Sequence, residues 1–214
     1  MWVKVCGLND PEIARQVARE QPDAVGLNFY PRSRRKVDLP IARQIVSELP
    51  PEIEPIGLFV NSPASEIRQI ASDVGLKTVQ LHGDEPVELL AELPGLRVIR
   101  AFRMGPDGLG DLWAYLERAD QLGCRPWAVL IDAYVPGEFG GTGQTAPWEQ
   151  LARDYRSDRD PPLILAGGLH AENVLDAIRQ VQPFGVDVAG GVENDQGCKD
   201  PARVRQFVAA ARSV

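Results

Sequence analysis

The stretch Leu163-Ile-Leu-Ala-Gly-Gly-Leu-His-Ala-Glu-Asn-Val-Leu-Asp-Ala-Ile178 places an apolar run, a glycine pair and a helical pattern in direct succession. The run at 162–166 is short and continuous, which is typical of a strand that is buried on both faces. The apolar spacing at 171–178 predicts a helix. A strand that is followed at once by a helix is the repeating unit of a parallel sheet.

The same unit recurs along the whole chain. Short runs rich in Val, Ile and Leu lie at 2–6, 23–29, 55–60, 77–82, 96–102, 127–132, 162–166 and 184–189. Segments between them, such as 12–19 and 64–71, have helical spacing, and Asp10-Pro11, Ser62-Pro63 and Asp200-Pro201 supply helix-start signals. Eight such units predict an α/β fold, a single-domain (β/α)8 TIM barrel over residues 1–214.

A doubly wound open sheet is the alternative architecture. It usually has fewer strands and often carries a G-x-G-x-x-G turn after the first one. Here the first turn is Cys6-Gly-Leu-Asn-Asp10, which lacks that pattern. The number of strands and the length of each unit favour the barrel.

Composition narrows the classes of partner. The 214 residues carry a net charge of −7, and the basic residues are scattered, so we expect no nucleic-acid partner and no membrane partner. The chain has no uninterrupted apolar stretch of transmembrane length and no signal-peptide layout at its start, which predicts a cytoplasmic protein. Its three cysteines are widely spaced and fit neither a disulfide framework nor a zinc site, so no metal is expected.

Polar residues end four of the eight apolar runs. They are Lys4 and Cys6, Gln80 and His82, Asp132, and Asp187. Residues two apart in a strand lie on the same side, so these groups are predicted to converge at the mouth of the barrel, where enzymes of this fold act. Each residue alone has an ordinary structural explanation as a small hydrophobe, a rim residue or a cap. Packing alone, however, would favour Val or Ile at such positions.

Glycine pairs follow the last two runs, at Gly167-Gly168 and Gly190-Gly191. This fold commonly binds phosphate there, through backbone N–H groups and a helix N-terminus. A tight turn is the alternative explanation for one pair, but two pairs in adjacent units favour a phosphate site. The long loop 133–145 contains four further glycines and could act as a closing lid or be an ordinary excursion.

Several motifs, in order along the chain, together resemble the phosphoribosylanthranilate isomerase family of tryptophan biosynthesis. They are Lys4-Val-Cys-Gly-Leu8, Phe29-Tyr-Pro-Arg-Ser-Arg-Arg35, Gly57-Leu-Phe-Val-Asn61, Val79-Gln-Leu-His-Gly83, Asp132-Ala-Tyr134, Gly140-Gly-Thr-Gly143, Leu165-Ala-Gly-Gly-Leu169 and Gly185-Val-Asp-Val188. The Lys-x-Cys-Gly opening and the Leu-Ile-Asp-Ala-Tyr segment are the specific parts. The glycine pairs are shared with many phosphosugar barrels.

The resemblance implies an Amadori rearrangement of N-(5-phosphoribosyl)anthranilate without a cofactor. It implies that Cys6 is the general base at C2 of the sugar and that Asp132 is the general acid at the ring oxygen. Arg35 falls at the position that meets the anthranilate carboxylate. The remaining positions implied are Gln80, His82 and Asp187 in the substrate pocket and Gly143, Gly167, Gly168, Gly190 and Gly191 around the phosphate. A barrel needs no partner to fold, so a monomer is expected.

Two positions depart from the family pattern. Arg34 stands where the family often has proline, which leaves open whether Arg34 or Arg35 meets the carboxylate. Ala189-Gly-Gly191 replaces the common Ser-Ser-Gly, so any hydroxyl contact to phosphate is lost.

Three other functions compete with this resemblance. The related isomerase of histidine biosynthesis has aspartate at the base position, where this chain has Cys6. A metal-dependent pentulose-phosphate epimerase would need more ligands than the two histidines, His82 and His170, suggest. A non-catalytic phosphosugar-binding barrel would need neither Cys6 nor Asp132.

The proposed base must act as a thiolate, although an ordinary cysteine is mostly protonated at neutral pH. Cys6 precedes a helix that is predicted to start at Asp10-Pro11, and Lys4 is two residues away. The helix dipole and the lysine are therefore expected to favour the thiolate of Cys6.

Overall fold

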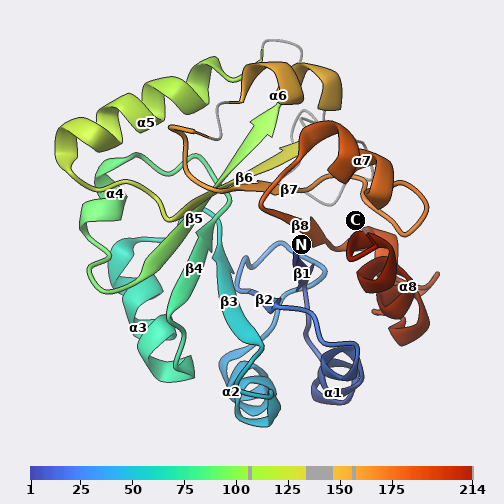
Figure 1. The fold of residues 1–214 in the computed structure, drawn as a ribbon. Helices are drawn as coiled ribbons and strands as arrows, with labels where there is room; N and C mark the ends of the chain where they lie inside the picture. Colours follow the sequence, from blue (N-terminus) through green and yellow to red (C-terminus); the bar gives the residue numbers. More distant parts are fainter. Residues whose placement is uncertain (106–107, 134–146, 156–157, 214) are drawn as a thin grey trace.

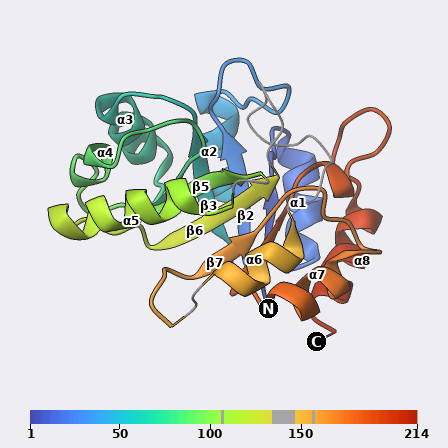
Figure 2. The same cartoon turned by 90° about the horizontal axis from the view of Figure 1, so that it is seen from above.

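The computed structural model describes residues 1–105, 108–133, 147–155 and 158–213. Eight parallel strands form a closed barrel in the order of the sequence, with the helices around the outside (Figure 1; Figure 2 gives a second view). The strands are β1 Trp2–Cys6, β2 Ala24–Asn28, β3 Glu54–Phe59, β4 Thr78–Leu81, β5 Arg97–Met104, β6 Ala128–Ala133, β7 Leu163–Leu165 and β8 Gly185–Val188. Each of the predicted apolar runs overlaps one of these strands, although β3, β5 and β6 extend one or two residues beyond the predicted bounds.

The pairing of the first strand with the last one closes the barrel. Trp2 is the Cα partner of Gly185, and Lys4 is the partner of Asp187, in a parallel ladder between β1 and β8. An open doubly wound sheet would leave two unpaired edges, so this ladder excludes that alternative and confirms the (β/α)8 barrel.

In the described part of the chain, helices and one 3₁₀ turn follow the strands. Their bounds are α1 Pro11–Arg19, α2 Leu39–Glu48, α3 Ala64–Val74, α4 Glu88–Ala91, α5 Gly110–Leu122, α6 Trp148–Asp154, α7 Val174–Val181, η1 Gly190–Val192 and α8 Pro201–Ala211. Over the described ranges, no helix combines the length and the apolar character needed to cross a membrane.

Apolar side chains form two main layers. One large cluster packs between the strands and the helices, and it includes Val5, Ile45 and Phe207. A second cluster contains alternate strand residues such as Ile56 and Leu130, together with small alanines. The continuous apolar runs in the sequence follow from this arrangement, because both sides of each strand are buried.

Two of the three predicted helix starts are capped as expected. Asp10 accepts a hydrogen bond from the backbone N–H of Ile13 (2.9 Å), and Asp200 accepts one from Ala202 (2.8 Å). The Ser62 prediction is wrong, because α3 begins after Pro63 and has no side-chain cap. The helix expected near residue 171 begins three residues later, because the chain first forms a turn that Asn173 stabilises by accepting a hydrogen bond from the N–H of His170 (2.9 Å).

Candidate active site

A cavity of about 370 Å³ lies among the residues that end the strands. Its walls come from strand ends and from the loops that follow them. The lining residues are Cys6, Asn28, Arg35, Leu58, Gln80, His82, Asp132, Ala166, Gly167, Gly168, Leu169, His170, Asp187, Ala189, Gly190 and Gly191.

The structure brings nearly all of the predicted site residues to this cavity. Both glycine pairs line it, as do six of the predicted side chains: Cys6, Arg35, Gln80, His82, Asp132 and Asp187. Gly143 lies outside the described residues, as does the glycine-rich loop from residue 134 to residue 146. The convergence predicted from the alternation along the strands is therefore observed for the part of the site that the structure describes.

Lys4 and Asp187 form an ion pair inside the barrel. Lys4 is fully buried, and its Nζ donates a hydrogen bond to Asp187 Oδ1 at 3.0 Å. Burial alone would lower the pKa of Lys4, but the charge of Asp187 and its hydrogen bond with Lys4 hold this pKa above its ordinary value. Lys4 therefore provides a fixed positive charge next to the cysteine.

The Cys6 thiol is buried beside this pair, and its pKa is raised. Burial is the largest cause and disfavours the thiolate, and the nearby Asp187 carboxylate also raises the pKa. The attraction of Lys4 acts in the opposite direction but is smaller. Lys4 thus favours the thiolate, as expected, but removal from water outweighs this attraction and the pKa of Cys6 stays above its ordinary value.

The space for the sulfur atom comes from the neighbouring strand. A Cβ atom at Gly26 of β2 would lie only 2.6 Å from Cys6 Sγ. Glycine at this position thus lets the thiol lie against the β2 backbone.

His82 and Gln80 lie next to Asp132. The Gln80 amide nitrogen is 2.8 Å from His82 Nδ1, and His82 Nε2 is 3.5 Å from Asp132 Oδ2. An amide nitrogen can only donate, so Nδ1 must accept, and a neutral imidazole then carries its proton on Nε2. This tautomer directs an N–H toward the carboxyl group of Asp132.

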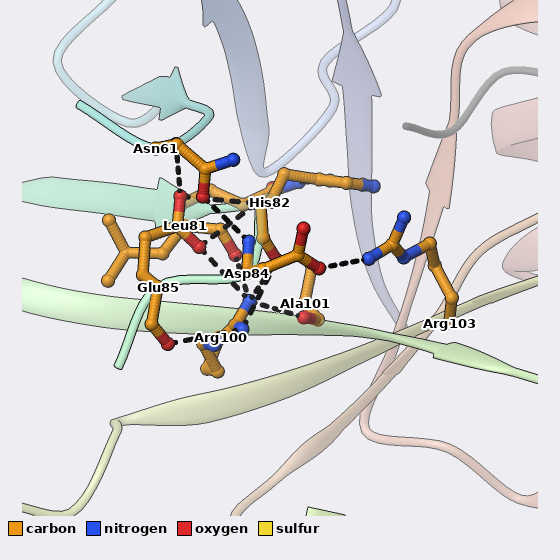
Figure 3. A network of polar contacts seen from close by, with 10 residues as sticks. Asn61, Leu81, His82, Asp84, Glu85, Arg100, Ala101 and Arg103 are labelled. Carbon is orange, nitrogen blue, oxygen red and sulfur yellow. Dashed lines mark hydrogen bonds and ion pairs between the residues drawn. The ribbon is translucent and has the colours of Figure 1, made fainter. Parts of the chain in front are cut away.

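A buried network outside the barrel supports the segment that carries His82 (Figure 3). Arg100 donates hydrogen bonds to the carbonyl groups of Leu81 and Gly83, both at 3.2 Å, on either side of the histidine. Glu85 pairs with Arg100 at 3.3 Å, and both of its carboxylate oxygens accept from the single backbone N–H of Gly83. Arg100 and Glu85 thus fix the backbone that positions the imidazole.

The structural reason for glycine differs among the positions of the two pairs. Gly167 and Gly168 have positive φ angles of 84° and 60°, which favour glycine. A Cβ atom at Gly191 would lie 1.9 Å from the carbonyl oxygen of Leu169, so close packing excludes a side chain there. A Cβ atom at Gly190 would meet only Arg35 Nη2, at 3.6 Å, so the wall at Gly190 is open to a ligand.

The two adjacent arginines have different environments. Arg35 lines the cavity and its side chain is 13% exposed, whereas the side chain of Arg34 is 65% exposed and is not part of the lining. Of the two, Arg35 is therefore the one that is placed to meet a ligand. Both contact Glu193, a residue that the sequence did not single out.

Sequence reasoning missed four residues at or beside the cavity. They are Asn28, His170, Glu193 and Lys199. Asn28 ends β2, and its place within an apolar run was a signal that could have identified it. Glu193 and Lys199 lie in a loop, where no periodicity marks a buried residue.

The fold and the cavity define a class: an enzyme of the (β/α)8-barrel type. Its cavity is lined by a thiol, carboxyl groups, an arginine and glycine loops. Within the described ranges, no group of three or more His, Cys, Asp or Glu side chains could hold a metal ion.

Comparison with known proteins identifies the family. A family model described as N-(5'phosphoribosyl)anthranilate (PRA) isomerase matches residues 3–210. Two proteins named N-(5'-phosphoribosyl)anthranilate isomerase, from Chlorobaculum parvum and Pseudomonas aeruginosa, are 40% and 43% identical over 99% of this chain and 95% of their own length. The chain belongs to the phosphoribosylanthranilate isomerase family.

Solved structures agree with this assignment. The crystal structure of phosphoribosyl anthranilate isomerase from Thermotoga maritima has a TM-score of 0.85 and 38% identity, covering 99% of this chain and 98% of that one. A phosphoribosyl anthranilate isomerase in complex with reduced 1-(o-carboxyphenylamino)-1-deoxyribulose 5-phosphate has a TM-score of 0.81 at 38% identity, with the same coverage.

The raised pKa of Cys6 predicts how its alkylation depends on pH. The rate of reaction with iodoacetamide should have its midpoint at a higher pH in the folded protein than in the protein unfolded in urea, because burial disfavours the thiolate. Peptide mass spectrometry separates Cys6 from the exposed Cys198, which reports that the reagent is active in each sample. A midpoint at or below that of the unfolded protein would show that the site stabilises the thiolate.

The open wall at Gly190 predicts that Gly190→Val weakens the binding of inorganic phosphate, because the new side chain occupies space at the proposed cradle. A loss of about tenfold in affinity corresponds to 1.4 kcal/mol and is measurable by calorimetry. Phosphate affinity equal to that of the unchanged protein would remove residue 190 from the cradle.

Proposed function

We propose that this chain converts N-(5-phosphoribosyl)anthranilate to 1-(2-carboxyphenylamino)-1-deoxyribulose 5-phosphate by an Amadori rearrangement, a step of L-tryptophan biosynthesis. Membership of the isomerase family supports this activity. The observation that carries the assignment of roles is that Cys6 on β1 and Asp132 on β6 line one cavity, together with Arg35.

Asp132 is the proposed general acid. It would give a proton to the furanose ring oxygen while the bond from that oxygen to C1 breaks and the nitrogen lone pair forms a C1–N double bond. The contact of 3.5 Å between Asp132 Oδ2 and His82 Nε2 fixes one face of the carboxyl group. The furanose ring oxygen of the substrate would accept the proton of Asp132.

Cys6 is the proposed general base. Its thiolate would remove the proton from C2, and the released electron pair would form a C1–C2 double bond and neutralise the nitrogen. The resulting enol takes up a proton at C1 and loses the proton of its C2 hydroxyl group, which gives the ketone. The sequence of steps is an isomerisation with no net oxidation, so it requires no electron-transfer cofactor.

The thiolate needed for this step is the minor form at neutral pH, because burial raises the pKa of Cys6. Lys4 lies beside the sulfur and stabilises whatever thiolate forms. A base whose pKa lies above the working pH still contributes, since its smaller charged fraction is offset by greater basicity.

The remaining residues bind the substrate in this proposal. Arg35 meets the anthranilate carboxylate, since a guanidinium fork suits a planar carboxylate. Gln80, His82 and Asp187 surround the sugar, and the loops at Gly167-Gly168 and Gly190-Gly191 hold the phosphate through backbone N–H groups. Gly143 is proposed to complete the phosphate site.

We also propose that the chain acts in the cytoplasm as a monomer. The closed ladder from β1 to β8 leaves no unpaired strand edge among the described strands, which supports folding without a partner. The related isomerase from Thermotoga maritima is described as dimeric. Sedimentation equilibrium at micromolar concentration should give a mass near 23.5 kDa, whereas twice that mass would refute the monomer.

The proton-transfer roles predict the effects of two substitutions. Cys6→Ser and Asp132→Asn should each lower kcat by roughly 10²–10⁴-fold with little change in affinity for a product analogue, because each removes a proton transfer and nearly preserves shape. The loss of anthranilate fluorescence during turnover measures kcat, and circular dichroism confirms the fold of each variant.

Either variant that retains more than about a tenth of the original kcat would exclude that residue as the acid or base. Absence of any fluorescence change with the unaltered protein at micromolar concentration would instead refute the isomerase activity itself.

A further inference from the structure

Glu193 is a buried carboxylate that holds three cationic side chains together. It follows η1, the turn that borders the cavity, and its side chain is 4% exposed. It is paired with Arg35, with the exposed Arg34 (2.9 Å) and with Lys199 (2.5 Å), whose side chain is also buried. Glu193 does not itself line the cavity in the described residues, so its role must be exerted through a neighbour.

The contact with Arg35 is bidentate and uses one edge of the guanidinium. Arg35 Nε donates to Glu193 Oε1 at 2.6 Å, and Nη2 donates to Oε2 at 3.0 Å. A guanidinium has a second edge, formed by Nη1 and Nη2, that can bind another carboxylate in the same way. Arg35 lines the cavity, and its Nη2 lies 3.6 Å from the Cβ position of Gly190 on the cavity wall.

The stem of Arg35 is fixed as well as its head. A Cβ atom at Gly7 would lie 2.5 Å from Arg35 Cδ, so the arginine stem packs directly on the backbone that follows Cys6. Gly7 has a φ angle of +90°, which favours glycine there. With the stem held by Gly7 and the head held by Glu193, the guanidinium has one orientation next to the proposed base.

Lys199 explains how a carboxylate can be placed behind an arginine without cancelling its attraction for an anion. Burial alone would raise the pKa of Glu193, but hydrogen bonds from Arg35 and the charge of Lys199 hold this pKa below its ordinary value. Glu193 therefore stays charged. Two buried cations, Arg35 and Lys199, thus contact this one carboxylate, although burial lowers the pKa of Lys199.

We propose that Glu193 is a positioning residue for substrate recognition: it clamps one edge of Arg35 so that the other edge faces the cavity and binds the carboxylate on the aromatic ring of the substrate. Lys199 supplies a second cation to Glu193. This inference rests on the proposed function, in which Arg35 meets that carboxylate. In this proposal, Glu193 contributes to the preference of the site for an amino sugar that bears a carboxylate on its aromatic ring over one that does not.

The test compares two ligands that differ only in the carboxylate. One is reduced 1-(2-carboxyphenylamino)-1-deoxyribulose 5-phosphate, and the other is the same molecule with an unsubstituted phenyl ring. Glu193→Asp keeps the charge but withdraws it from Arg35 by one methylene group. It should weaken the carboxylate ligand by about tenfold, as expected for loss of one charge-assisted contact, and change the phenyl ligand less than about twofold.

Four further variants complete the experiment. Arg35→Met should abolish the difference between the two ligands, and Glu193→Asp combined with Arg35→Met should add no further loss. Arg34→Met is the matched control, because this arginine also contacts Glu193 but lies on the solvent side, and it should leave both affinities unchanged. Glu193→Gln should also reduce the difference, since its amide places a donor against the donors of Arg35.

The outcomes separate positioning from other roles. If the affinities for both ligands fall equally and the melting temperature is lower, Glu193 only holds its loop in place through its contact with Lys199. In a second outcome, Glu193→Asp leaves the affinity difference between the ligands unchanged and Glu193→Gln binds the carboxylate ligand more tightly. That outcome would show that the negative charge of Glu193 repels the ligand carboxylate. Either result overturns the proposal. If Glu193→Asp does not fold, the Gln variant alone decides between these results. A parent protein that binds both ligands equally would instead refute the role of Arg35 in the proposed function.

Discussion

The ion pair between Lys4 and Asp187 is the contact on which the rest of the site depends. The two residues are partners in the ladder that joins β1 to β8, so they meet where the barrel closes. Both are withdrawn from water, and a buried charge that loses its partner is strongly destabilising. The strand pairing that closes the barrel therefore also places a fixed positive charge beside Cys6.

The charges around the cavity follow from that constraint. The interior of a barrel has a low effective dielectric, so each buried charge needs a partner of opposite sign within a few ångströms. Lys4 is matched with Asp187, and Arg35 with Glu193, which Lys199 contacts in turn. The thiol between these clusters is the group that remains neutral, because burial raises its pKa.

The barrel and most of the cavity could be predicted from the sequence, because both depend on local periodicity. A period of two placed Cys6 and its strand-end counterparts on the inner side of the strands, and the eight apolar runs gave the strand count. Ser62 was misassigned as a cap, because a cap depends on where the first helical turn begins in space. Glu193 and the pKa of Cys6 could not be predicted, because both depend on burial by residues that are distant in sequence.

The glycine at position 26 has a consequence for how this active site can change. Its missing side chain provides the volume that the sulfur of Cys6 occupies, so the two positions share one space across adjacent strands. A larger group at either position must be accommodated at the other, and in evolution the two are expected to vary together. A longer acidic side chain in place of the thiol would first have to fit into this shared space, whatever its acidity. Glycine at position 26 leaves the most space for such a substitution.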